Sequence, residues 1–570
     1  MLDLVIRGAE VVDGTGAPRR RADVGIRDGR IEAVREGLGP ARRTLDAEGA
    51  VLAPGFVDVH THYDAQVFFD PTLSPSPLHG VTTAIGGNCG FSIAPLVPEA
   101  APYLARMLAR VEGMPLESLE AGVPWDWGSF GEYLDRIEGT LAIHAGFLVG
   151  HSTLRRVAMG ERAVGERATP EDLETMGRLL EESLRAGALG FSSSLAPTHN
   201  DAEGRPVPSR HATGEELLAL ASRVARHPGT TLEFIPTVGP FSEAVVDLMT
   251  ELSLAARRPL NWNVLGVSSW SDLWREQLRA SDVAAERGAR VVALTLPQVM
   301  TLRLNFRSGF VLDAFPGWGE VLSLPLAERK AALADPAVRE RMLRGAHSEE
   351  AGVFRALAGF EKMRIDEAFT EAGRAFEGRT VGELAAARGV EPFDALLDLA
   401  VAEDLRTSFM PQIPGDDEAS WKARAEAWLD PRTVVGGSDA GAHLDMIDTF
   451  SFTTALLGPA VRDRGLLSLE EAVHQLTEVP ARLLGLRGRG RIAPGAHADL
   501  VLFDPSRIGP GRVRTQYDLP GGAGRLTGGA HGILRVLVAG REVVVDGELT
   551  DQRPGAVLRS GRDTETVLCG

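Results

Sequence analysis

The sequence is poor in cysteine: Cys89 and Cys569 are the only two among 570 residues. Two cysteines so far apart do not make a disulfide framework, so a reducing, cytoplasmic location is expected. The opening MLDLVIRGAEVVDG has no basic stretch followed by an apolar core, so no secretory signal is predicted. No run reaches the roughly 18 apolar residues that a transmembrane helix needs, so no membrane association is expected.

Basic residues are also in deficit, because 60 Lys and Arg stand against 78 Asp and Glu, for a formal net charge of −18. Such a charge repels phosphates, so nucleic acid and anionic membranes are not expected partners. No GxGxxG turn follows the first central strand, and neither a P-loop nor a GxSxG motif is present. These absences argue against a dinucleotide-binding sheet, a nucleoside triphosphatase and a serine hydrolase.

Both ends of the chain alternate apolar and polar residues. Examples are LDLVIRGAEVVDG and ADVGIRDGRIEAV near the start, and ILRVLVAGREVVVDGEL near the end. A period of two with Gly and Asp between the segments predicts short strands. We therefore predict one small β-sandwich domain built from residues 1–54 together with residues 487–570.

The centre of the chain alternates short apolar segments with helical patterns. One such pattern is TPEDLETMGRLLEESLRAGA (169–188), where Thr169 is expected to cap the helix with Asp172 just inside it. This alternation predicts parallel strands with crossover helices, and eight such units predict an α/β fold of the TIM-like (β/α)8 barrel type over residues 55–486. The eight expected strands lie in 55–62, 80–90, 141–151, 188–195, 230–239, 259–267, 290–297 and 432–441.

The gap between the seventh and eighth expected strands is too long for an unstructured loop. It contains helical patterns such as TVGELAAARGVEPFDALLDLAVAEDL (380–405). We predict an inserted segment, at about 298–375, near the mouth of the barrel.

Two histidines end the first barrel strand, in GFVDVHTHYD. Side chains two positions apart on a strand face the same way, so His60 and His62 project together at the end of the barrel where active sites lie. Two imidazoles directed at one point can bind a metal ion, although an isolated HxH is structural about as often. Asp58 is expected to orient these ligands. Cys89, in GGNCGFS at the end of the second strand, is either a thiolate ligand at the same rim or an inert buried thiol.

Asp439, in VVGGSDAGAH, ends the eighth strand. A carboxylate beside a metal ion can take a proton from water and pass it to a leaving amine. His443 is a candidate for substrate contact, with a surface loop position as the alternative. Glu233 on the fifth strand offers an oxygen ligand for the metal, whereas the amide of Asn263 on the sixth is a poor ligand and a candidate for substrate binding.

The remaining candidates are weaker. His144 and His151 are seven residues apart near the third strand, so at most one of them should face the barrel mouth; His151 is kept as a candidate for substrate binding. Arg303 and Arg307 follow the seventh strand, where an arginine can hold a substrate carboxylate, although a structural role is more common.

The sequence resembles the amidohydrolase superfamily, and within it the D-aminoacylase (N-acyl-D-amino-acid deacylase) family. The matching stretches include LVIRGAEVVDGTG, APGFVDVHTHYD, GVTTAIGGNCGFSIAPL, GGSDAG and EVPARLLGLRGRGRIAPGAHADLVLFDP, in order along nearly the whole chain. The resemblance implies a metal-bearing barrel with one or two zinc ions, in which His60 and His62 bind one metal position and Asp439 is the general acid/base. It implies that Cys89 is a ligand either shared with the tight zinc position or belonging to it. It also implies hydrolysis of an amide bond in a small molecule, and suggests a homo-oligomer.

The sequence departs from the family pattern at two places. The family has metal-binding histidines at the ends of the fifth and sixth strands, whereas TTLEFIPTVG and PLNWNVLGVS contain none. The arginine that family members use to grip the substrate carboxylate shortly after the catalytic aspartate is also missing, and Asp445 and Asp448 occur there instead.

Three interpretations remain. One metal ion is bound through His60, His62, Cys89 and Asp439, with or without Glu233. Alternatively, the protein hydrolyses another substrate, such as a cyclic amide or imide, a lactone or a carbamate. In the third, the barrel has lost its metal site and serves another task.

Overall fold

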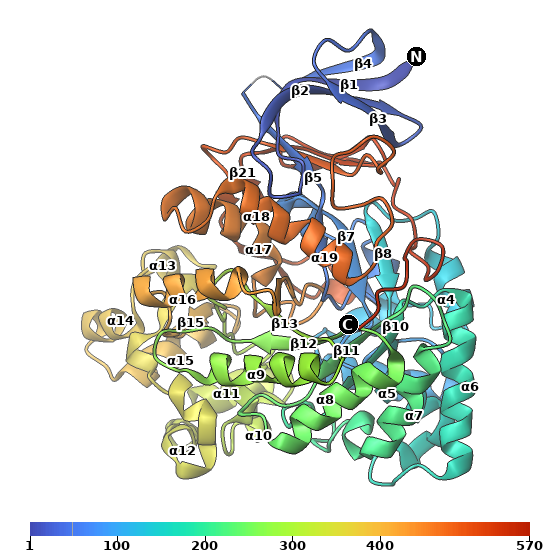
Figure 1. Ribbon diagram of the computed structural model, residues 1–570. Helices are drawn as coiled ribbons and strands as arrows, with labels where there is room; N and C mark the ends of the chain where they lie inside the picture. The colour runs from blue at the N-terminus through green and yellow to red at the C-terminus, as the bar shows by residue number, and fades with distance from the viewer. Residues whose placement is uncertain (48, 570) are drawn as a thin grey trace.

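The computed structural model describes residues 1–47 and 49–569. Figure 1 shows a central barrel surrounded by helices, a β domain above it, and a helical lobe at one side. Each of the eight predicted strand segments contains a strand of the barrel. The barrel strands are β6 (Phe56–Asp58), β7 (Val81–Gly86), β8 (His144–Phe147) with its continuation β9 (Val149–Gly150), β10 (Gly190–Ser194), β11 (Thr231–Ile235), β12 (Leu260–Leu265), β13 (Val291–Thr295) and β16 (Thr433–Val435).

These strands form two sheets that join into a closed ring. One sheet has the order β6-β7-β8, and the other has the order β9-β10-β11-β12-β13-β16. The ring closes between β6 and β16, where Thr61 and Ala440 form a parallel bridge and the His62 N–H donates to the Ala440 carbonyl at 2.7 Å. The predicted (β/α)8 barrel is confirmed, and its closure places the residues after β6 beside those after β16.

Amphipathic helices cover the outside of the barrel. In α6 (Pro170–Ala186) the Thr169 hydroxyl accepts from the Asp172 N–H and the Asp172 carboxylate accepts from the Thr169 N–H, as the sequence predicts. The helix buries Met176, Leu180 and Leu184. The other helices of the barrel region are α1 (Gln66–Phe69), α2 (Ala101–Val111), α3 (Leu116–Gly122), α4 (Phe130–Ile137), α5 (His151–Met159), α7 (Gly214–Val224), α8 (Glu243–Ala256), α9 (Leu273–Glu286), α16 (Glu418–Trp428), α17 (Phe452–Ala455), α18 (Leu469–Leu476) and α19 (Glu478–Leu483).

The β domain combines both ends of the chain. Where a sandwich was expected, the strands belong to one continuous sheet of order β24-β23-β22-β17-β5-β1-β2-β3, with β4 also paired to β1. Its inner side chains, among them Leu4, Leu52, Leu500 and Leu537, pack into one core. The bounds are β1 (Leu2–Val11), β2 (Arg20–Arg27), β3 (Arg30–Arg35), β4 (Ala41–Asp46), β5 (Val51–Pro54), β17 (Leu500–Phe503), β22 (Ile533–Val538), β23 (Arg541–Val545) and β24 (Glu548–Leu549).

Two C-terminal segments lie against the barrel. Between β17 and β22 the chain forms β18 (Gly509–Pro510), β19 (Arg514–Gln516), β20 (Arg525–Thr527) and β21 (Ala530–His531). In this segment Arg525 pairs with Asp70 at 2.8 Å. After β24 the chain returns to the barrel, where the Gly555 N–H donates to the Leu141 carbonyl at 2.9 Å. The boundary predicted at residue 487 remains a prediction.

A helical lobe lies between β13 and α16, drawn yellow in Figure 1. It has its own core, which includes Trp318, Phe360 and Phe393 and reaches Met446 and Ile447 in the loop after β16. Between β13 and α16, the buried residues of this core run from Leu304 to Phe409. They include residues of α14 (Val381–Arg388) and α15 (Pro392–Ala402), so the lobe continues past residue 375. Its elements are α10 (Gly319–Leu322), α11 (Leu326–Ala334), α12 (Pro336–His347), β14 (Arg364–Glu367), α13 (Glu371–Arg374), α14 (Val381–Arg388), α15 (Pro392–Ala402) and β15 (Ser408–Met410).

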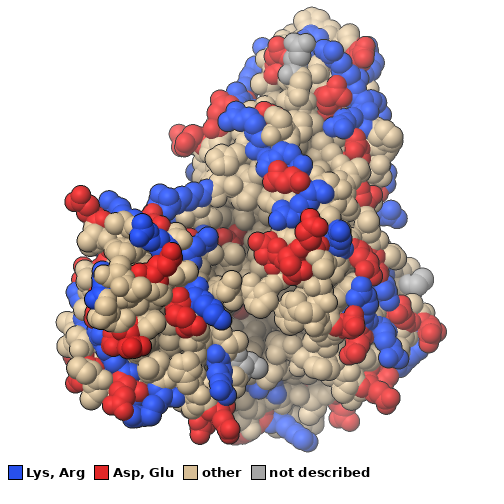
Figure 2. Space-filling view, turned by 90° about the vertical axis from the view of Figure 1, so that its left-hand side faces the viewer, with Lys and Arg blue, Asp and Glu red and all other residues tan. Residues whose placement is uncertain are grey.

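The outer surface carries charges of both signs. Figure 2 shows acidic and basic side chains interspersed on one face, with the β domain as a narrower lobe above a broader, hollowed lower part. Among the described residues, no helix combines the length and the apolar character that a membrane crossing requires.

His79 joins the barrel to the loop before β21 and gives a stability prediction. Its Nε2–H donates to the Gly528 carbonyl at 3.1 Å, and its Nδ1 lies 2.8 Å from the Thr454 hydroxyl. Burial lowers the pKa of His79 from 6.5 to about 4. In that pH range the unfolded chain binds a proton that the folded protein does not, so the free energy of unfolding falls as the pH falls. The loss from this residue between about pH 7.5 and about pH 5 is roughly 2 kcal/mol.

Substitution His79→Gln removes this proton uptake. Urea denaturation at the two pH values should show a smaller acid-induced loss of stability in His79→Gln than in the wild type. His531→Gln, at an exposed position on β21, serves as the control. An equal loss in the wild type and in His79→Gln would contradict the prediction.

Candidate metal centre

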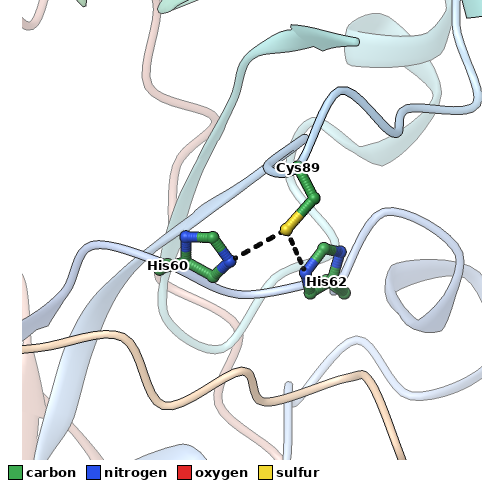
Figure 3. A group of neighbouring side chains, drawn as sticks. All are labelled: His60, His62 and Cys89. Carbon is green, nitrogen blue, oxygen red and sulfur yellow. Dashed lines mark hydrogen bonds between the residues drawn. The ribbon is translucent and has the colours of Figure 1, made fainter. Parts of the chain in front are cut away.

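Two imidazoles and a thiol meet at the carboxyl end of the first barrel strands. His60 and His62 follow β6 and are both buried. Cys89 Sγ lies 3.3 Å from His60 Nε2 and 3.5 Å from His62 Nε2, and Figure 3 shows the three side chains pointing toward one another. The turn that carries Cys89 needs Gly87, which has φ +76° and no room for a Cβ, since that atom would lie 2.1 Å from the Leu148 carbonyl oxygen. The structure thus brings the predicted trio together.

Asp439 reaches the same cluster from the other side of the barrel closure. Its Oδ1 lies 3.1 Å from His62 Nε2 and 3.6 Å from His60 Nε2. Its backbone N–H donates to the His60 carbonyl at 3.1 Å, and this bond fixes the position of Asp439 relative to the two histidines. About a quarter of its side chain is exposed (27%), whereas both histidine side chains are almost fully buried. Asp439 is therefore the member of the cluster that a substrate can approach.

Glu233 and Asn263 lie on the fifth and sixth barrel strands, β11 and β12, which contain no histidine. Glu233 Oε2 accepts from the Cys89 N–H at 2.9 Å, while Oε1 lies 3.9 Å from His60 Nδ1. Oε1 therefore lies on the side of His60 opposite to the nitrogen that faces Cys89. That Glu233 is a metal ligand stays a prediction. Asn263 Nδ2 lies 3.3 Å from His60 Nε2, close to the cluster itself.

Two further residues at the site, Glu112 and His199, were not predicted from the sequence. Glu112 follows α2 and places Oε2 at 3.6 Å from His62 Nε2. It lies after a helix, so the search of strand ends missed it. His199 follows β10, where its Nδ1 bonds the Ser194 hydroxyl at 2.8 Å, and the charge of His62 contributes to its lowered pKa of about 3, after burial as the larger cause. The strand-end rule could have found His199.

Asp58 forms hydrogen bonds with backbone N–H groups and with the Ser438 hydroxyl rather than with an imidazole ring. It accepts the Ser438 hydroxyl, the Ser438 N–H at 3.3 Å and the His60 N–H at 3.4 Å. Burial raises its pKa to about 7. Through these bonds it joins the chain after β6 to the chain after β16.

The other sequence candidates fall at different distances from the cluster. His443 lies beside it, with Nε2 at 3.7 Å from Asp439 Oδ2. His151 is fully buried, and its two ring nitrogens bond Glu216 at 2.8 Å and Ser193 at 2.9 Å, so neither is free for a substrate. His144 bonds Asp499 at 3.1 Å.

Arg303 is engaged in a structural contact. Its guanidinium pairs with Asp366 at 2.7 Å and with Asp448 at 2.9 Å. Asp445 accepts from the Asn305 amide at 2.8 Å. Asp445 and Asp448, which occur where family members have an arginine, thus bond to the start of the helical lobe. Arg303 is not free to bind a substrate.

The cluster is rich in buried acids. Burial raises the pKa of Glu233 to about 8 and that of Glu112 to about 7. Burial also raises the pKa of the Cys89 thiol well above its usual range. Among the described residues, the ion pairs of Glu112, Glu233 and Asp439 are all with histidines. The cluster therefore holds more acid than its basic side chains can balance.

The two histidines differ in protonation. Burial lowers the pKa of His60 to about 3, so its ring is neutral and offers a lone pair. Burial acts the same way on His62, but the charges of Glu112 and Asp439 outweigh it and raise the pKa to about 9. Against the effect of burial, hydrogen bonding to His62 and its charge hold the pKa of Asp439 well below its usual range. A cation bound here would replace the proton on His62.

The residues fit a zinc ion. Donors bonded to a tetrahedral zinc at about 2.0–2.3 Å lie roughly 3.3–3.6 Å from one another. The separations of His60 Nε2 and His62 Nε2 from Cys89 Sγ, 3.3 and 3.5 Å, match this spacing. The separations of the same two nitrogens from Asp439 Oδ1, 3.6 and 3.1 Å, are close to it. Among the described residues, His60 Nδ1 and Glu233 Oε1 have no hydrogen-bond partner, and they lie 3.9 Å apart.

Known proteins are similar to this chain in sequence over nearly its whole length. The D-aminoacylase of Alcaligenes xylosoxydans xylosoxydans is 28% identical over 565 residues, which cover 98% of this chain and 97% of that protein. The N-acyl-D-glutamate deacylase of the same organism is 30% identical over 581 residues, which cover 98% of this chain and 96% of that protein.

Solved structures agree with these relatives. The N-acyl-D-glutamate deacylase of Bordetella bronchiseptica, complexed with zinc and a phosphonate inhibitor, matches with a TM-score of 0.65 and 28% identity over 98% of this chain and 100% of that chain. A D-aminoacylase studied for its binuclear metal centre also has a TM-score of 0.65, with 26% identity and the same coverage.

The family comparison covers most of the chain. The family model described as "Amidohydrolase family" matches residues 43–550 of this chain. Together with the relatives, this match confirms the resemblance seen in the sequence. The chain belongs to the amidohydrolase family.

Proposed function

We propose that this protein is a metal-dependent hydrolase that cleaves an amide C–N bond outside a peptide chain in a small molecule. The observation that carries the proposal is the meeting of His60, His62, Cys89 and Asp439 from three separate parts of the barrel. These residue types at these distances suit zinc, which the Bordetella bronchiseptica relative contains.

His60, His62, Cys89 and Asp439 would hold the zinc ion, which would supply polarisation of a carbonyl group and a lower pKa for water. Asp439 moves the proton: one of its oxygens takes it from water and passes it to the nitrogen of the leaving amine. The two histidines hold Oδ1, while Oδ2 faces His443 at 3.7 Å. His443 in turn packs on Phe310 with 5.2 Å between ring centroids, which places it at the border of the site toward the helical lobe.

The names of the relatives suggest N-acyl-D-amino acids as substrates. A cavity of about 490 Å³ is lined by Phe310, Arg307, Arg406 and Tyr517, among others, and Phe310 packs on His443. Its size suits a small molecule, and its four arginines, against three acidic residues in the same lining, favour a carboxylate group there. These features support an acylated D-amino acid as the first choice.

A second candidate is a cyclic amide or imide, a lactone or a carbamate. It is favoured by the loop after Asp439, where Asp445 and Asp448 are held by the helical lobe and no arginine is present.

We also propose a cytoplasmic location, because the Cys89 thiol has to stay reduced to bind a metal ion. A homo-oligomer remains a proposal from family resemblance.

Metal analysis combined with a substrate panel tests the function. The purified protein should contain about one equivalent of zinc or more per chain. It should lose activity on chelation, regain it with zinc, and hydrolyse N-acetyl-D-amino acids but not their L-forms. His60→Ala should lower both zinc affinity and rate at least about tenfold, because a ligand is lost.

Two outcomes would contradict this account. Full activity in metal-free protein would exclude metal dependence. Turnover of cyclic amides without turnover of any N-acetyl-D-amino acid would replace the first substrate class by the second.

Asp439→Asn tests the proton transfer. The variant should retain its zinc, because His60, His62 and Cys89 remain, while kcat falls by about 10²–10⁴-fold, since an amide cannot accept the proton. Asp551→Asn, at an exposed position after β24, is the matched control for charge. Wild-type kcat in zinc-loaded Asp439→Asn would show that another group transfers the proton.

A further inference from the structure

Glu112 is a buried carboxylate directed at the metal cluster from outside the barrel strands. It follows α2, and its side chain is only 3% exposed. Among the described residues its carboxylate makes one ion pair, with His62 Nε2 at 3.6 Å, and accepts no hydrogen bond. A carboxylate buried with so little compensation is stable in its ionised form only when a group of positive charge lies beside it.

Three donor atoms surround the place where that charge would lie. His62, Glu112 and Asp439 each offer one atom, and these atoms all lie within 4.8 Å of one another. The same limit holds for the trio of His60, His62 and Cys89. His62 belongs to both trios, and the contacts to Cys89, Asp439 and Glu112 all involve its Nε2. One ring nitrogen has one lone pair, so it can bind one ion at a time.

We propose that Glu112, His62 and Asp439 form a second cation position that competes for His62 with the thiolate position of His60, His62 and Cys89. The chain then holds one ion tightly, in one of two positions. This inference rests on the proposed metal-dependent function, and it adds a ligand and a rule of exclusion to it.

The two positions differ in chemistry. Thiolate and imidazole donors favour zinc, whereas one imidazole with two carboxylates also suits harder ions such as Mn²⁺. With zinc available, the thiolate position should fill first. The carboxylate position should become the main one when the thiol is removed.

The backbone holds Glu112 and the loop of Asp439 together. The Glu112 carbonyl accepts from the His443 N–H, and a Cβ on Gly113 would lie 3.2 Å from the His443 Cα. The end of α2 and residues 439–443 therefore form one packed unit, so Glu112 and Asp439 stay at a fixed spacing.

Metal binding measured without any activity assay tests the proposal. Zn²⁺, Mn²⁺ and Co²⁺ are titrated into metal-free wild type, Cys89→Ser, and Cys89→Ser combined with Glu112→Gln. The wild type should bind one equivalent of Zn²⁺ tightly, and its Co²⁺ form should show sulfur-to-cobalt charge-transfer absorption. Cys89→Ser should lose that absorption but still bind Mn²⁺. Adding Glu112→Gln should weaken Mn²⁺ binding at least about tenfold.

The controls separate this inference from the proposed function. Glu120→Gln, an exposed carboxylate on α3, makes the same charge change in the Cys89→Ser background and should leave Mn²⁺ affinity unchanged. Equal Mn²⁺ affinity with and without Glu112→Gln would exclude Glu112 as a ligand. Two tightly bound Zn²⁺ per wild-type chain, a result that needs no variant, would exclude the competition. If the wild type binds none of the three ions, the proposed function itself fails.

Discussion

The constraint on which the site depends is a cluster of buried acids, whose ionised forms need a partner of positive charge. Glu112, Glu233 and Asp439 lie around His60 and His62, and their ion pairs among the described residues are with histidines alone. A protein interior tolerates such a set only when protons or a cation balance it. Zinc in the cluster would supply positive charge there and would be bound by His60, His62, Cys89 and Asp439. The electrostatics and the geometry therefore point to the same occupant, which is why the amidohydrolase family assignment and the metal-dependent chemistry support each other.

The rest of the fold serves to hold these donors in register. Barrel closure ties the chain after β6 to the chain after β16, with Asp58 bonded to Ser438 and the His60 carbonyl bonded to the Asp439 N–H. The helical lobe fixes the loop that follows, because Arg303 pairs with Asp448. Asp439 and His443 both have positive φ, at 58° and 48°, a conformation that costs energy for residues other than glycine. The contacts from the lobe and from the end of α2 offset that cost, so elements remote from the barrel strands determine where Asp439 stands.

Much of this architecture could be predicted from the sequence, because it rests on local periodicity. The eight strands, the terminal β domain and the cap at Thr169 follow from alternation and turn residues. His60, His62, Cys89 and Asp439 were found because parallel strands of a barrel end at one rim. Glu112 was missed because it reaches the site from the end of a helix, through a tertiary contact that has no local pattern. Glu233 was found as a candidate ligand, but only the three-dimensional structure shows that its Oε1 lies on the Nδ1 side of His60.

X-ray absorption at the zinc edge of the reconstituted wild-type protein tests the central claim most directly. If imidazoles after β6, the thiol after β7 and a carboxylate after β16 share one ion, the spectrum should contain one sulfur at about 2.3 Å and nitrogen or oxygen donors at about 2.0–2.2 Å. Scattering from imidazole rings should also be present. A zinc shell with no sulfur, or one made of oxygen donors alone, would contradict the account, because the ion would then lie outside the cluster formed by His60, His62 and Cys89.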